Sequence, residues 1–268
     1  MFYGKLPIMV LSEIVSGDSD ATNSHIAAYV LEHFKEIKDD SIRDLAAKTH
    51  VSTSSISRFC RDIGLRDYME LKEMIATTPL NFEICSLSDI PAVQKDDYIS
   101  AVQDSMERVR RSIDMEKLER LARDIQRYPR VSVFGILKGE TAAMNLQTDL
   151  AMLGKAAVTK LRFAEQAQCL SKTDADDLLI IFSYTGIFYD YGYPRSQAKG
   201  KSRAKIYFIT SDPKAEQSGL YDEVIWFESL QNQASHPYQL QLVAGLIAQT
   251  YAHFLREQEQ EGNARETP

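Results

Sequence analysis

The sequence predicts two domains: an all-α N-terminal domain that contains a helix-turn-helix, and a C-terminal α/β domain built on a parallel sheet. The length of 268 residues exceeds that of a usual single domain. Apolar residues recur at helical spacing before residue 80, whereas later short apolar runs alternate with helical segments. Such alternation implies a parallel sheet covered by helices on both faces. We therefore expect a helix-turn-helix domain over residues 1–78, a linker over 79–96, the α/β domain over 97–257 and a polar tail over 258–268.

The composition is that of an ordinary soluble globular protein, with 44% hydrophobic and 26% charged residues. A formal net charge of −7 argues against a protein that binds polyanions through its overall charge. Residues 1–80 carry nine Lys and Arg against twelve Asp and Glu, so any attraction to nucleic acid must be local. Its expected sources are Arg58, Arg61, Arg66 and Lys72. Affinity for a single site should then be modest, and dimerisation must raise it.

The three cysteines, Cys60, Cys85 and Cys169, are widely spaced and odd in number, which is typical of reduced cytosolic thiols. They form no CxxC pair and have no neighbouring histidine, so we expect neither a metal site nor a cofactor. No signal peptide or membrane span is visible, because the apolar runs are short and charges recur throughout. The predicted location is the cytoplasm.

The stretch from Ser41 to Gly64 has the pattern of a helix-turn-helix, and two further helices are expected before it, over residues 5–16 and 24–37. Its apolar residues follow the spacing of an inward helix face: Ile42, Leu45 and Ala46, then Ile56, Phe59, Cys60 and Ile63. Residues 49–52 are short enough to form the turn between the two helices. His50 stands where this turn generally has a glycine, and histidine tolerates a positive φ better than most residues. Ser52 is the predicted N-cap of the second helix.

The second helix presents short hydroxyls at its start and guanidinium groups further along, a surface that suits DNA. Small residues allow a close approach to base edges, while arginines reach guanine edges or phosphates. The alternative is a structural cluster of helices with a polar face. The predicted DNA-binding residues are Ser52, Thr53, Ser54, Ser55, Ser57, Arg58, Arg61 and Lys72.

The remaining elements follow from the same periodicities. Asp67 can cap a helix whose apolar stripe runs from Tyr68 to Ile75. Helices are then expected over 97–113, 115–128, 140–153 and 163–170, after Pro194, up to Ser218, and over 238–258. The expected strands cover 130–136, 156–161, 177–183, 205–210 and 223–227.

Two loops lie where a parallel sheet binds ligands, beyond the carboxyl ends of strands and before helix N-termini. They are Gly135–Glu140 and Ser183–Gly186. Hydroxyls and free backbone N–H groups at a helix start suit a phosphate. The same residues are also common in ordinary strand-to-helix turns, so the pattern alone leaves both interpretations open.

The run LAAKTHVSTSSISRFCRDIGLRDYMELK resembles the N-terminal domain of the RpiR/MurR transcription regulators. The matching features are Leu45-Ala46, Val51-Ser52, Arg58-Phe59-Cys60, Gly64, Tyr68 and Lys72. Residues 97–257 resemble the sugar isomerase (SIS) domain, a three-layer α/β fold that is the usual C-terminal partner in this family. The resemblance implies a DNA-binding regulator of carbohydrate metabolism, a homodimer or tetramer on a palindromic operator, with a sugar phosphate as effector.

The second loop resembles the family's Ser-x-Ser-Gly phosphate cradle, with Thr185 in place of the second serine. The predicted ligand-binding residues are Lys138, Gly139, Ser183, Thr185 and Gly186. Lys138 would supply charge to the site, and the alternative is that it is an ordinary solvated loop lysine. Several positions depart from the pattern. Gly139 stands where the family has a phosphate-binding serine, Leu137 replaces a glycine, and Ile187 and Phe188 replace Glu and Thr. We therefore expect either weak sugar-phosphate binding or a changed effector.

An alternative function is a sugar-phosphate isomerase with an accessory helical domain. It would need an acid or base beside the sugar, and the available residues are Glu140, Glu165 and His236. None lies in a supporting motif, so we expect no catalytic residues and no enzyme activity. A second alternative is a helix-turn-helix that contacts only proteins.

Overall fold

The computed structural model describes residues 5–17, 21–78, 91–191, 203–232 and 235–266. By packing, the chain divides into two compact units. The first contains Met1–Glu83, Lys160–Lys172 and Ile187–Lys201, and the second contains Ile84–Thr159, Thr173–Gly186 and Ser202–Pro268. Each unit is described separately below.

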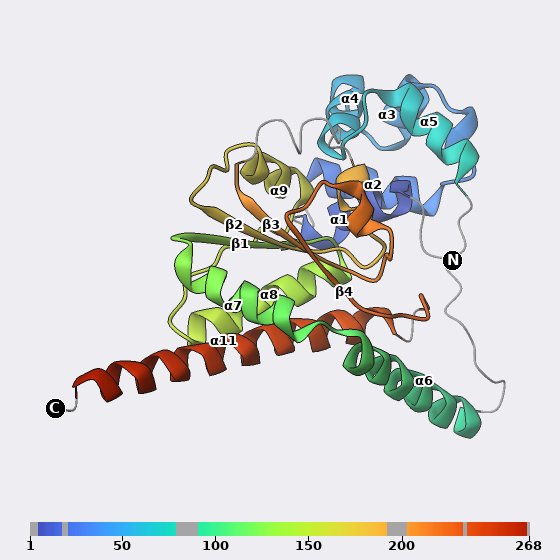
Figure 1. The fold of residues 1–268 in the computed structure, drawn as a ribbon. Helices are drawn as coiled ribbons and strands as arrows, with labels where there is room; N and C mark the ends of the chain where they lie inside the picture. Colours follow the sequence, from blue (N-terminus) through green and yellow to red (C-terminus); the bar gives the residue numbers. More distant parts are fainter. Residues whose placement is uncertain (1–4, 18–20, 79–90, 192–202, 233–234, 267–268) are drawn as a thin grey trace. The chain divides into compact units, whose positions relative to one another are not determined.

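The first unit is helical, as predicted (Figure 1). Its elements are α1 Lys5–Ser16, α2 Thr22–Glu32, η1 Ile37–Asp39, α3 Ile42–Lys48, α4 Thr53–Asp62, α5 Tyr68–Thr77, α9 Phe163–Leu170 and η2 Phe188–Tyr191. The α1 helix matches its prediction, whereas α2 ends at Glu32 and the chain reaches α3 through a turn and η1. The core of this unit includes Leu6, Ile26, Val30, Ile37 and Leu71, all fully buried.

The α9 helix was predicted correctly in its bounds but expected in the α/β domain. It packs with α1, and so does η2, which places both elements in the first unit. The rings of Phe163 on α9 and Phe188 on η2 meet edge to face, with centroids 5.9 Å apart. Contacts of this long-range kind leave no periodic signal in the sequence.

The second unit is built on a parallel sheet of four strands in the order β1-β2-β3-β4 (Figure 1). The strands are β1 Arg130–Gly135, β2 Asp177–Phe182, β3 Lys205–Thr210 and β4 Glu223–Trp226. The predicted strand over 156–161 is wrong as an extended element, because only Val158 bridges to Ser132 of β1. Val158 is 48% exposed, so this edge position lacks the burial that would favour a longer strand.

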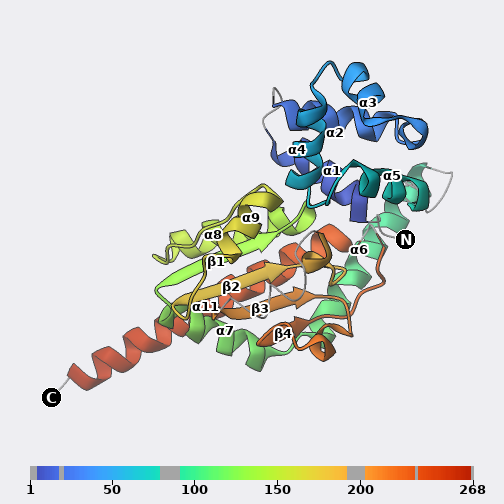
Figure 2. The same cartoon turned by 90° about the horizontal axis from the view of Figure 1, so that it is seen from above.

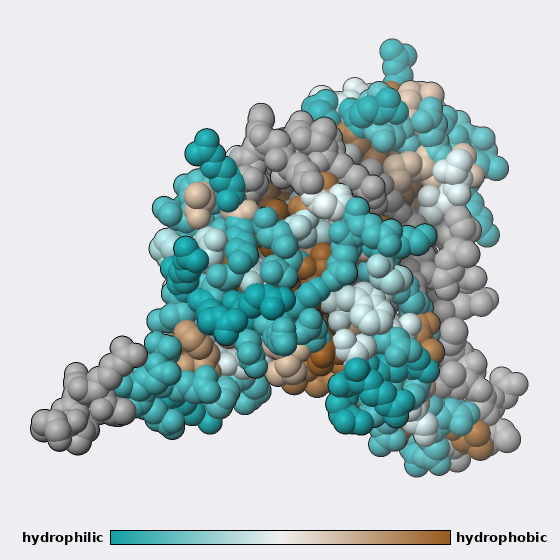
Figure 3. Space-filling view, viewed as in Figure 1, coloured by the Kyte–Doolittle hydropathy of each residue, from teal (hydrophilic) through white to brown (hydrophobic). Residues whose placement is uncertain are grey.

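Helices α7 and α8 lie along the sheet, and α11 packs against both (Figure 2). The helical elements are α6 Pro91–Ser112, α7 Met115–Arg127, α8 Lys138–Met152, η3 Ala215–Ser218 and α11 His236–Glu266. The α7 helix buries Leu118, Leu121 and Ile125 and shows a hydrophilic outward face in Figure 3.

Two helices of this unit are longer than predicted. The α6 helix begins at Pro91, inside the predicted linker, and α11 continues to Glu266, through most of the predicted tail. The helix expected after Pro194, the linker residues 79–90 and Cys85 lie outside the described residues. Within the described part of the chain, no helix has the length and apolar character needed to span a bilayer.

Candidate functional sites

The helix-turn-helix is held by side-chain caps at each of its helices. Ser41 and Asp44 form a reciprocal capping box at the start of α3. The Ser52 hydroxyl accepts the backbone N–H of Ser55 at 3.1 Å, so the predicted N-cap of α4 is confirmed. The turn residue His50 has φ of 53°, as its position required. The Asp67 cap of α5 is also confirmed, because its carboxylate accepts the N–H of Glu70 at 3.0 Å.

One face of α4 is buried and holds the helix in place. Ile56, Phe59 and Cys60 are each 0% exposed, which confirms the predicted inward stripe. Burial raises the pKa of the Cys60 thiol to about 12, so this cysteine stays protonated and is a packing residue.

The opposite face of α4 carries the predicted DNA-binding residues. Ser52, Thr53, Ser54, Arg58 and Arg61 are exposed. The remaining two on this helix, Ser55 and Ser57, are half-buried. The hydroxyl of Ser52 lies 2.7 Å from that of Ser54 and 2.9 Å from that of Ser55, so a compact hydroxyl cluster stands at the helix N-terminus. Ser57 instead donates to the carbonyl of Thr53 at 3.1 Å.

The cations near this face differ in how far their charge is already compensated. Arg58 and Arg61 make no hydrogen bond or ion pair with any residue that the structure describes. Arg66 is ion-paired with Glu70 at 3.1 Å, so it is a weaker source of attraction than the sequence indicated. Lys72 is half-buried on α5, with the Asp44 carboxylate in its electrostatic range. Arg43, an exposed arginine on α3, is not among the predicted DNA-binding residues. The sequence indicates such a role only through its position on the first helix of the motif.

The first loop of the second unit joins β1 to α8. Its packing leaves no room for a serine side chain at position 139, where the family has one. A Cβ atom on Gly139 would lie 2.6 Å from the carbonyl oxygen of Phe182 at the end of β2. That distance is far inside van der Waals contact, so only glycine allows α8 to start this close to the strand. Leu137 has φ of 54° and ψ of −112°, a strained backbone at the position where the family has glycine.

Lys138 is the first residue of α8 and is half-buried. Burial lowers the pKa of its ammonium group. No ion pair joins it to a residue in the described part of the chain. A cation at a helix N-terminus, beyond the carboxyl end of a strand, is a suitable partner for an anion.

The second loop follows β2 and contains Ser183, which is buried, and Thr185, which is half-buried. Gly186 has φ of 78°, and a Cβ atom there would lie 2.6 Å from the Asp212 Oδ2 atom. A carboxylate therefore stands directly against the cradle loop. Its negative charge opposes a phosphate, which adds to the loss of side-chain donors already predicted.

An aromatic stack borders this loop. The ring of Tyr184 lies over the imidazole of His236 with centroids 4.0 Å apart and contacts Phe227 at 6.0 Å. Two aromatic residues that follow the loop, Phe188 and Tyr189, pack on each other in the first unit. Burial, and then the charge of Lys138, lower the pKa of His236 to about 3. The imidazole is therefore neutral near pH 7. Sequence reasoning named His236 only as a possible catalytic residue, because its contact with Tyr184 is formed by tertiary packing.

Comparison with known proteins decides the family. Residues 9–78 match the profile of a family described as "Helix-turn-helix domain, rpiR family". Residues 9–78 are therefore a helix-turn-helix domain of the rpiR family. Its helix-turn-helix and its Arg58-Phe59-Cys60 run lie inside the matched segment.

Curated relatives of this chain are named as transcription regulators. An uncharacterized HTH-type transcriptional regulator of Providencia stuartii is 24% identical over 69% of this chain and 68% of the relative. The HTH-type transcriptional regulator HexR of Pseudomonas aeruginosa is 22% identical over 60% of this chain and 58% of HexR. The alignments thus leave 32% of the Providencia relative and 42% of HexR unmatched.

Solved structures support the fold of both units. The Vibrio vulnificus NanR protein complexed with ManNAc-6P has a TM-score of 0.52 at 18% identity, and the match covers 98% of each chain. A putative sugar-phosphate isomerase from Listeria monocytogenes has a TM-score of 0.51 at 15% identity and covers 68% of this chain and 100% of its own. The chain therefore combines an rpiR-family helix-turn-helix with a domain of SIS-like fold, as predicted.

His236 should make the stability of this protein depend on acid pH. Its folded-state pKa of about 3 lies below the ordinary value of 6.5, so between these values the unfolded chain binds more protons. This contribution to stability is present above pH 6.5 and is lost as pH falls toward 3. A His236→Phe variant, which keeps a ring against Tyr184, should lose less stability than the wild type between pH 7 and pH 4 in urea unfolding experiments.

The control for this experiment is His253→Phe, because His253 is an exposed histidine on the same helix. It should retain the wild-type pH dependence. Equal slopes for wild type and His236→Phe would show that the imidazole of His236 titrates normally.

A separate cavity of about 380 Å³ lies beyond the ends of β3 and β4. Its lining residues are Ser112, Asp114, Lys117, Asp212, Pro213, Glu216 and Trp226. The Lys117 ammonium is already bound by Glu216 and by the Val224 carbonyl at 2.8 Å. With three carboxylates and one compensated amine, this cavity is less suited to a phosphate than the loop at Lys138 is.

Proposed function

We propose that the RpiR-type regulator reads double-stranded DNA by placing α4 in the major groove. The observation that carries this proposal is a capped, firmly buried helix that exposes uncompensated Arg58 and Arg61 next to a cluster of hydroxyls. In a helix-turn-helix the N-terminal residues of the second helix contact base edges, while the first helix crosses the phosphate backbone. Arg43 on the first helix is then an additional candidate for phosphate contact.

The protein acts in the cytoplasm as a homodimer or tetramer on a palindromic operator. A single helix-turn-helix with few uncompensated cations binds DNA weakly. When one helix-turn-helix of a dimer is bound, the second is held at a high effective concentration near its half-site, which raises the affinity. Half-sites would lie about 34 Å apart, or a multiple of that distance.

The direct test is recovery of the DNA fragments that the purified protein retains from the host's genome, followed by sequencing. We expect a shared two-fold symmetric sequence upstream of genes for carbohydrate metabolism. If the retained fragments share no sequence and the protein instead captures other proteins through α4, the helix-turn-helix is a protein-contact module.

The effector is proposed to be an anionic carbohydrate derivative of the sugar-phosphate class, bound weakly at the two loops. Support comes from the fold shared with NanR, which was solved with ManNAc-6P, and from the position of Lys138 at the start of α8. The remaining proposed contacts are Gly139, Ser183, Thr185 and Gly186. Affinity should be low because Gly139 offers no hydroxyl and Asp212 stands against the loop.

Replacing Lys138 by Ala should abolish any thermal stabilisation by sugar phosphates. For the wild type at ligand concentrations near 100 times Kd, binding adds roughly 2.7 kcal/mol of stability. Hexose and pentose phosphates should be titrated while the melting temperature is followed. Lys155→Ala is the matched control, because Lys155 is another lysine with a burial-lowered pKa, bonded to the carbonyl of Tyr128 at 2.7 Å. Retention of the shift in Lys138→Ala would exclude this lysine from the site.

The isomerase alternative receives little support from the candidate acid and base residues. His236 has its pKa lowered to about 3, which makes it a poor proton donor at neutral pH. Glu165 is exposed on α9, and Glu140 is buried at the start of α8. We therefore propose a regulator without catalytic activity. Conversion of aldose to ketose phosphate well above background would overturn that part of the proposal.

A further inference from the structure

A buried amide joins three parts of the second unit. Gln239, on α11, is 0% exposed. Its Nε2 group donates to the carbonyl of Ser105 on α6 at 2.7 Å and to the carbonyl of Glu228 at 3.0 Å. Its Oε1 atom accepts the hydroxyl of Tyr184, in the second ligand loop, at 3.2 Å. The Gln239 amide thus makes all of these hydrogen bonds only while the ligand loop, α6 and Glu228 keep their observed positions.

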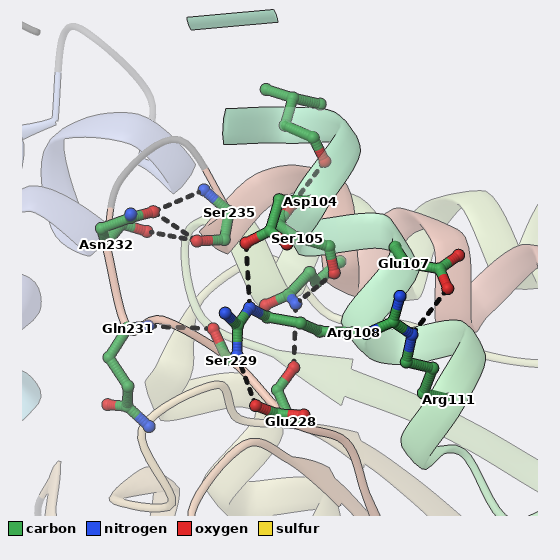
Figure 4. Close-up of polar contacts among 12 residues, drawn as sticks. Asp104, Ser105, Glu107, Arg108, Arg111, Glu228, Ser229, Gln231, Asn232 and Ser235 are labelled. Atoms are coloured by element: carbon green, nitrogen blue, oxygen red, sulfur yellow. Dashed lines mark hydrogen bonds and ion pairs between the residues drawn. The ribbon is translucent and has the colours of Figure 1, made fainter. Parts of the chain in front are cut away.

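Glu228, the first residue of the segment 228–232, holds α6 through further contacts, shown in Figure 4. The Arg108 guanidinium lies between the carboxylates of Asp104, at 3.0 Å, and Glu228. The backbone N–H of Glu228 donates to the Ser112 hydroxyl at 2.8 Å. Both Arg108 and Ser112 belong to α6, so the last two turns of this helix are fastened to the segment.

The same segment is also fastened to the ligand loop. The Tyr184 hydroxyl is bonded to that of Ser229 as well as to Gln239. The Gln231 amide donates to the Ser211 hydroxyl at 3.1 Å, and Ser211 donates to the carbonyl of Tyr184 at 2.8 Å. Tyr184 immediately precedes Thr185 and Gly186, so a displacement of the loop by a ligand would move its ring.

We propose that Gln239 couples occupation of the ligand loop to the position of α6. This inference rests on the proposed function. The α6 helix is the first described element after α5 of the helix-turn-helix unit, so the chain joins the two units at the start of α6. A ligand that displaces Tyr184 takes the donor away from the buried Gln239 oxygen. The amide must then find another partner, and its hold on Ser105 weakens because a buried polar group left unsatisfied is costly.

The test needs no known effector, because the Tyr184→Phe variant removes the same hydroxyl. The matched control is Tyr207→Phe: Tyr207 is also fully buried, and its hydroxyl donates to Asp124 on α7 at 2.7 Å, away from α6. Amide hydrogen exchange should be about tenfold faster over 102–112 of α6 in Tyr184→Phe and unchanged there in Tyr207→Phe. The affinity for a genomic fragment retained by the wild type should fall roughly threefold or more in Tyr184→Phe alone.

A double variant separates coupling from general destabilisation. In Gln239→Leu the hydrogen bonds from residue 239 to Tyr184 and to Ser105 are already lost. Adding Tyr184→Phe should therefore change neither the hydrogen exchange of α6 nor the DNA affinity further. Additive effects, or the same α6 exchange in Tyr184→Phe and Tyr207→Phe, would overturn the proposed coupling. Failure of the wild type to retain any DNA would instead defeat the proposed function.

Discussion

Replacing Arg58 and Arg61 together by Ala is expected to lower operator affinity by about 100-fold or more, since each well-placed arginine contributes roughly 1–3 kcal/mol to base recognition. Both guanidinium groups are exposed and uncompensated within the described residues, so their charge is available to DNA. If they contact phosphates, the slope of log affinity against log salt should fall by about 0.9 for each lost contact. Gel retardation at several salt concentrations measures both quantities.

The control must remove equal charge from the same unit without touching α4. Lys35 and Lys38 are exposed and precede α3, so Lys35→Ala with Lys38→Ala changes the net charge by the same amount. This control should bind DNA close to the wild-type level, and both double variants should keep the wild-type oligomeric state. Equal losses in the two double variants would mean that overall charge, and no specific surface of α4, governs binding.

Restoring the family's serine at Gly139 is expected to destabilise the protein, although the change adds the hydroxyl that the phosphate site lacks. The new Cβ atom would lie 2.6 Å from the Phe182 carbonyl oxygen, and both partners belong to the packed junction of α8 and β2. Overpacking of this kind costs about 1–3 kcal/mol, which lowers the melting temperature by roughly 5 °C in a unit of this size. Gly139→Ser should therefore melt earlier and gain no affinity for sugar phosphates.

The matched substitution is Gly245→Ser on α11. A Cβ atom there meets nothing within 4 Å, so the helix should tolerate it without loss of stability. If Gly139→Ser were as stable as Gly245→Ser and also bound sugar phosphates more tightly, the loop would have room for the serine, and the steric explanation would be wrong.

Local patterns predicted the parts of this protein whose conformation depends on near neighbours in the chain. Ser52, Asp67 and His50 each act within a few residues, through caps and a turn, and the structure bears out all three. The apolar spacing of α4 and the alternation of strands with helices likewise depend on local periodicity, which is why the helix-turn-helix and the parallel sheet were predictable. Exposure of Arg58 and Arg61 follows from the same helical period.

Contacts between distant segments carry no such signal, and they decide how the ligand site is built. The backbone of Phe182 excludes a side chain at Gly139, and Asp212 stands against Gly186. His236 and Tyr184 are separated by more than fifty residues yet stack on each other. Spacing along the chain thus predicted the helix-turn-helix and the parallel sheet. The space, charge and protonation state around the ligand loops were decided only when the strands brought remote residues together.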